Sequence, residues 1–127
     1  MRDIENRKDI ENLVDNFYKL VIKDELIGSF FTKVVVLDWE KHIPVMYNFW
    51  ETIVLGNITY KGNPMLKHIS LSQKKAIKEE HFDRWLKLWE STLSQYFQGP
   101  KANEALNRAQ QIAELMKFKI KQHAQSS

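Results

Sequence analysis

The sequence contains no cysteine among its 127 residues. That absence excludes a disulfide framework, a thiolate zinc site, an iron–sulfur cluster and a cysteine nucleophile. Any metal ion must therefore be held by histidine or carboxylate side chains.

Long apolar runs are also missing, because no stretch approaches the roughly 18 residues that a membrane span requires. The first residues, Met1 to Glu5, are charged and lack the apolar core of a signal peptide. We therefore expect a cytoplasmic protein that does not enter a membrane.

Several familiar site motifs do not occur. There is no His-Glu-x-x-His, no glycine-rich phosphate loop, and none of the four histidines has a glutamate three residues before it. The 19 basic and 16 acidic residues are mixed, without a block of five like charges. A self-contained zinc or phosphate site is not expected, and neither is nucleic-acid binding.

The apolar residues that are present recur at helical spacing. A hydrophobic content of 43% suits one compact domain over residues 1–127, with 1–8 and 122–127 expected to be frayed. A first helix from about Asp9 is indicated by apolar residues at steps of three and four along one face: Ile10, Leu13, Val14, Phe17 and Val21.

Three further helices are predicted. Asp38 is a candidate N-cap for the next one, although Pro44 fits best in a first turn, so its regular part is expected to begin nearer Lys41. A long helix ends before Gly99, and Pro100 opens the last helix, whose alanines would allow close packing. These elements predict an all-α domain.

One histidine, His68, stands alone on a short segment between two loop-like stretches, while the long helices carry Tyr18, His42 and Trp85. A haem iron needs an imidazole on one side, an apolar slot for the macrocycle and hydrogen-bond donors on the other side. The sequence can supply all three. Each residue also has an ordinary structural explanation, so a cofactor-free helical interaction module stays open at this point.

A family resemblance bears on this choice. Phe17-Tyr18, the run from Trp39 to Trp50, the run from Tyr60 to His68, and His81 to Leu86 occur in this order. Together with the absence of Gly-Gly pairs, they closely resemble the group III truncated haemoglobins of bacteria. The similarity extends from about Asp9 to Met116, which is most of the chain.

The resemblance implies a two-over-two helical sandwich around haem b. In that family the histidine matching His68 is the proximal iron ligand, and the residues matching Tyr18, His42 and Trp85 line the distal pocket. Apolar haem contacts are expected from Phe31, Met46 and Phe49. Lys67, beside His68, is a candidate for meeting a haem propionate.

The implied function is binding of dioxygen, nitric oxide or carbon monoxide at a five-coordinate iron. Reversible oxygen binding and transport, nitric oxide oxidation to nitrate, and peroxidase-like turnover are the alternatives within this class. Turnover needs an electron donor, and the sequence holds no flavin or nicotinamide motif. A separate reductase is therefore expected.

Overall fold

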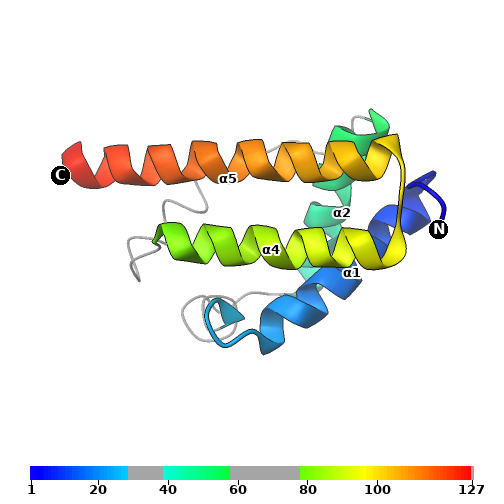
Figure 1. Cartoon of the computed structure of the whole chain (residues 1–127), viewed down its shortest axis with the longest axis horizontal. Coiled ribbons are helices and arrows are strands. Elements are labelled where there is room, and N and C mark those ends of the chain that lie inside the picture. Colours follow the sequence, from blue (N-terminus) through cyan, green and yellow to red (C-terminus); the bar gives the residue numbers. More distant parts are fainter. Residues whose placement is uncertain (29–38, 58–77, 127) are drawn as a thin grey trace.

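The computed structural model of the chain describes residues 1–28, 39–57 and 78–126, with side chains for 1–28, 43–57 and 78–122. This part of the chain is helical and has no strand. Figure 1 shows α4 and α5 side by side, while α1 and α2 form a second pair that crosses them. The all-α prediction is confirmed. The four helices are α1 (Arg7–Lys23), α2 (Trp39–Leu55), α4 (Glu79–Tyr96) and α5 (Pro100–Ser126).

The first helix forms where the periodicity predicted it. Asn6 caps its N-terminus, because the Asn6 side chain accepts a hydrogen bond from the Asp9 amide at 3.0 Å. Asp24 ends the helix in an extended conformation. The apolar face between these caps is buried and consists of Ile10, Leu13, Val14, Phe17, Tyr18 and Val21.

Aromatic rings from three helices meet at the centre of the core. Trp89 of α4 is fully buried and stacks on Trp50 of α2, with ring centroids 4.3 Å apart. Phe17 of α1 meets Trp89 edge-on at 4.9 Å. Because such pairs add to the free energy of burial, this cluster joins α1, α2 and α4. On the α5 side the core is closed by small residues, as predicted: Ala102, Ala105 and Ala109.

The predicted boundary between α4 and α5 agrees with the structure, whereas the predicted start of α2 differs from it. Gly99 lies between α4 and α5, and Pro100 is the first residue of α5, as predicted. The second helix, however, begins at Trp39 and includes Pro44 inside it, so the expected start near Lys41 was wrong. The helix tolerates Pro44 near its N-terminus, where only one intrahelical amide bond is lost.

The N-terminal segment packs against the start of α5, although the sequence led us to expect residues 1–8 to be frayed. Ile4 is only 1% exposed. The Asp3 carboxylate accepts hydrogen bonds from the amides of Lys101 and Ala102, both at 2.9 Å, and so caps α5. Gly99 has a φ of +148°, and a Cβ atom there would collide with the Asp3 carboxyl group. At the other end α5 continues through Ser126, past the point where fraying was expected.

Three aspartates of the fold have pKa values below their usual range. For Asp3, burial raises the pKa, but the amides of Lys101 and Ala102 lower it more. For Asp9, hydrogen bonds from the Arg2 guanidinium are the main cause. For Asp24, burial is outweighed by bonds from the amide of Ile27 and from Arg84. These carboxylates therefore stabilise the fold in their ionised form.

We expect the free energy of unfolding to fall in acid. The unfolded chain takes up protons near the ordinary aspartate pKa of about 3.9, whereas the folded chain resists them until a lower pH. The stabilisation is therefore complete above about pH 5, begins to fall near the ordinary pKa, and is lost as the pH drops through the lowered values. Urea unfolding followed by tryptophan fluorescence between neutral pH and pH 3 measures this, and Asp3→Asn should show a shallower acid loss. An Asp3→Asn protein with an unchanged acid dependence would contradict the assignment.

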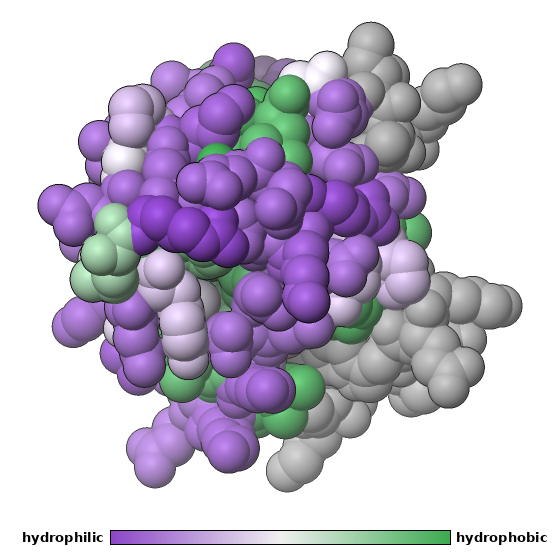
Figure 2. Space-filling model, turned by 90° about the vertical axis from the view of Figure 1, so that its right-hand side faces the viewer, coloured by the Kyte–Doolittle hydropathy of each residue, from purple (hydrophilic) through white to green (hydrophobic). Residues whose placement is uncertain are grey.

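The surface of the described residues is mostly hydrophilic. Figure 2 views the end of the molecule where α5 begins, and hydrophilic residues cover most of it, with apolar ones in small patches. No helix within the described ranges has both the length and the apolar character that crossing a membrane requires.

Candidate functional site

Tyr18 lies on the buried face of α1 and is 7% exposed. Its ring meets Phe17 edge-on, with centroids 5.2 Å apart. Burial raises the pKa of the Tyr18 phenol well above its usual range, because the phenolate would lose its hydration. The hydroxyl therefore stays protonated at neutral pH and can act as a hydrogen-bond donor.

Trp85 lies on α4, partly buried, with its ring parallel to Trp89 at a centroid distance of 6.5 Å. The two indoles differ in their hydrogen bonding. The Trp89 N–H donates to the Ala105 carbonyl at 3.2 Å, so Trp89 ties α4 to α5. For the Trp85 N–H, no acceptor is found among residues 1–28, 43–57 and 78–122. Of these two indoles, Trp85 is therefore the one whose N–H can be offered to a ligand.

Both donors meet the same ring. Phe17 contacts Tyr18, its neighbour in the chain, and it contacts Trp85 edge-on at 6.0 Å. This shared contact brings together two polar groups from different helices. From the sequence, Phe17 was predicted only as an apolar residue on the inner face of the first helix; its position directly before Tyr18 was the available signal.

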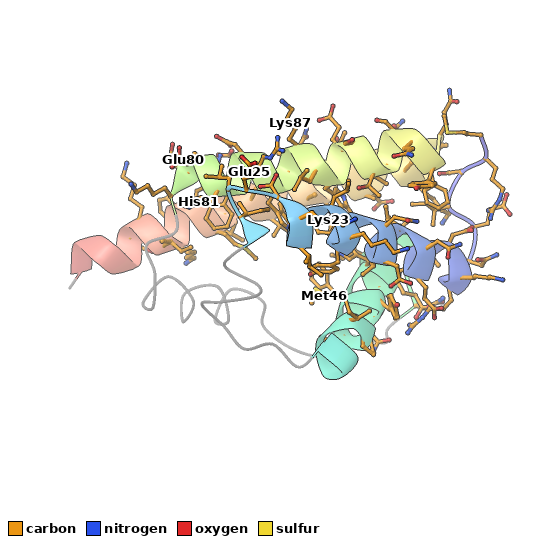
Figure 3. The ribbon with its side chains drawn as sticks, turned by 90° about the horizontal axis from the view of Figure 1, so that it is seen from below. Lys23, Glu25, Met46, Glu80, His81 and Lys87 are labelled. Carbon is orange, nitrogen blue, oxygen red and sulfur yellow. The ribbon has the colours of Figure 1, made fainter. Side chains whose placement is uncertain are left out.

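The second helix contributes an apolar wall. Met46 and Phe49 are partly buried and pack against the core cluster that contains Phe17 and Tyr18. They are three residues apart and so lie on one face of α2. Figure 3 shows Met46 on the side of α2 where α1 crosses, whereas Lys87 of α4 projects away from the molecule.

Phe31, Lys67 and His68 lie outside the described residues, and of His42 only the backbone is described. His42 stands one helical turn before Met46 in α2. The structure therefore brings Tyr18 and Trp85 together at Phe17, and it places Met46 and Phe49 against the core cluster that contains Phe17 and Tyr18.

Comparison with known proteins identifies the family. The bacterial-like globin family matches residues 3–120. A group 3 truncated haemoglobin, ctb, of Campylobacter jejuni is 34% identical over 111 residues, which is 85% of each chain. The crystal structure of a group III truncated haemoglobin from Campylobacter jejuni superposes with a TM-score of 0.81 at 32% identity, covering 94% of this chain and 95% of that one. This chain belongs to the group III truncated haemoglobins.

As a globin, this truncated haemoglobin binds haem and, through it, diatomic gases. The family membership favours the haem interpretation over the cofactor-free interaction module. The described residues also fit the group. Met46 and Phe49 offer apolar contacts to a macrocycle. Tyr18 and Trp85 are neutral donors, which suits a small ligand that carries partial negative charge.

Proposed function

We propose that this truncated haemoglobin binds dioxygen at a five-coordinate haem b iron and uses it to oxidise nitric oxide to nitrate. His68 is the proposed iron ligand. The proposal includes nitric oxide and carbon monoxide as further gas ligands, a single domain over residues 1–127, a cytoplasmic location and a separate reductase that returns the iron to the ferrous state.

One observation carries the proposal. Tyr18 and Trp85, the two proposed distal donors, come from different helices and contact the same ring, Phe17. The neighbouring indole of Trp89, by contrast, uses its N–H inside the core, on the Ala105 carbonyl of α5. Two neutral donors beside an apolar wall support binding of a small polarised ligand.

Held by His68, Met46 and Phe49, a bound haem would supply the iron to which the gas binds, and the bound gas would carry partial negative charge. The residues of the chain then act on the ligand. The Tyr18 hydroxyl and the Trp85 indole donate hydrogen bonds to its negative end, and each such bond contributes roughly 1 to 3 kcal/mol in a pocket that excludes water. Carbon monoxide carries less charge, so the same donors hold it less strongly. The raised pKa of Tyr18 keeps its proton on the phenol throughout.

The other proposed residues hold the macrocycle. Phe31, Met46 and Phe49 form apolar contacts, and Lys67 pairs with a propionate. His42, near the start of α2, is the third distal residue in this proposal. Its position one turn before Met46 supports a place on the gas side of the macrocycle.

Stopped-flow mixing tests the proposed reaction. The oxygenated protein is mixed with nitric oxide, and nitrate is measured together with the absorption spectrum. We expect about one nitrate for each haem and conversion to the ferric spectrum. Release of dioxygen without nitrate would overturn the proposal, as would peroxide turnover that proceeds while no nitrate forms.

A further inference from the structure

The two proposed donors are carried by separate helices, so their relative position depends on how α1 packs against α4. Tyr18 is on α1 and Trp85 is on α4. The edge contacts of Phe17 allow some sliding, because aromatic edge-to-face packing has a broad geometry. A directional contact between the same two helices would define their register more sharply.

Such a contact exists between Asp24 and Arg84. Asp24 follows α1 directly, and its side chain is 4% exposed. One carboxylate oxygen accepts from the amides of Leu26 and Ile27, at 3.1 and 3.0 Å. The other accepts from Nε of Arg84 at 2.7 Å. A single buried carboxylate therefore shapes the turn after α1 and holds a residue of α4.

The Asp24–Arg84 contact lies close in the chain to both proposed donors. Arg84 directly precedes Trp85, and Asp24 comes six residues after Tyr18, which is about 9 Å along a helix. In Figure 3, Glu25, next to Asp24, lies toward the same end of the molecule as Glu80 and His81 at the start of α4. Anchoring Arg84 limits both the rotation of α4 about its axis and its displacement along α1.

The Asp24–Arg84 ion pair contributes little to the free energy of unfolding. Arg84 is 39% exposed, and ion pairs with one solvated partner contribute little because water and salt screen them. Its geometry is nevertheless well defined, since the carboxylate is buried and both of its oxygens are used. A positioning role agrees with both facts.

We propose that the Asp24–Arg84 pair positions Trp85 relative to Tyr18 and thereby controls how fast the gas ligand leaves. Neither residue touches the ligand, so both are positioning residues. This inference rests on the proposed function for its effect on the gas, and on the described geometry for its effect on Trp85.

Two substitutions and a matched control test the pair. Arg84→Gln removes the charged partner, and Asp24→Asn removes the charge while keeping an oxygen for the amides of the turn. The control is Asp83→Asn, at the neighbouring residue of α4, which breaks a bridge to Lys117 of α5 at 2.6 Å. Asp83 ties α4 to α5, not to α1.

We expect each of the two substitutions to speed dioxygen dissociation roughly three- to tenfold, the equivalent of weakening one hydrogen bond. The double variant should be no faster than the faster single variant, because the two residues act through one contact. Asp83→Asn should release dioxygen at the wild-type rate. A wild-type rate in Arg84→Gln would overturn the inference.

A second readout does not depend on haem. The indole N–H resonances of the ¹⁵N-labelled full chain report the surroundings of each tryptophan. We expect the Trp85 signal to move in Arg84→Gln and Asp24→Asn, while the Trp50 signal stays in place, and to remain fixed in Asp83→Asn. If the chain bound no haem, the proposed function would fail and the indole signals would still decide the inference. If the chain bound dioxygen while neither the Trp85 signal nor the dissociation rate changed, only the inference would fail.

Discussion

Replacing His68 by alanine is expected to abolish stable iron ligation. The proposed proximal bond is the one protein bond that holds the iron, and alanine has no donor atom to replace it. The other histidines are His42, His81 and His123, on different segments of the chain. The absorption spectrum of the ferrous protein, recorded with one equivalent of haem, measures the effect.

His42→Ala is the matched control, because it also removes an imidazole but leaves the proposed proximal bond. It should retain the five-coordinate spectrum. Added imidazole should restore ligation in His68→Ala, since the free ligand can occupy the space left by the side chain. An ordinary proximal histidine spectrum in His68→Ala without added imidazole would move the role to another residue.

Tyr18→Phe should release dioxygen about five-fold to more than a hundred-fold faster than the wild type. The change removes one hydroxyl, and a buried hydrogen bond to a polarised ligand contributes roughly 1 to 3 kcal/mol. The ring stays, so its edge contact with Phe17 is kept. Carbon monoxide should leave with a much smaller change, because it carries less charge. Stopped-flow replacement of one gas by the other measures both rates.

Tyr47→Phe is the matched control for this prediction. Tyr47 is a tyrosine of α2 whose hydroxyl donates to the Asp15 carboxylate, so its proton is already used between α1 and α2. Its removal should leave the dioxygen rate unchanged. Should Tyr18→Phe and Tyr47→Phe both behave as the wild type, the Tyr18 hydroxyl does not reach the ligand.

The helical fold could be predicted from the sequence because its signals are local. The apolar stripe of α1 and the Gly99–Pro100 boundary depend on residues a few positions apart. The packing of the N-terminus could not be predicted in this way. Asp3 caps α5 through the amides of Lys101 and Ala102, which are nearly a hundred positions away in the chain.

The candidate site, like the fold, could be predicted from the sequence only in part. Tyr18 and Trp85 were selected by family resemblance, whereas their spacing alone left a core role open. Their meeting at Phe17 depends on how α1 packs on α4, which no local pattern specifies. Asp24 and Arg84 were missed for a related reason. An aspartate after a helix and an arginine within a charged helix are common, and nothing in the sequence pairs them.

Titration of the purified chain with haem tests the central claim most directly. We predict an intense Soret band that grows linearly to one haem per chain and then stops. The ferrous form should show a five-coordinate spectrum that changes on adding dioxygen or carbon monoxide. A chain that stays colourless with haem present, or takes it up without saturation, would contradict the proposed binding of one haem.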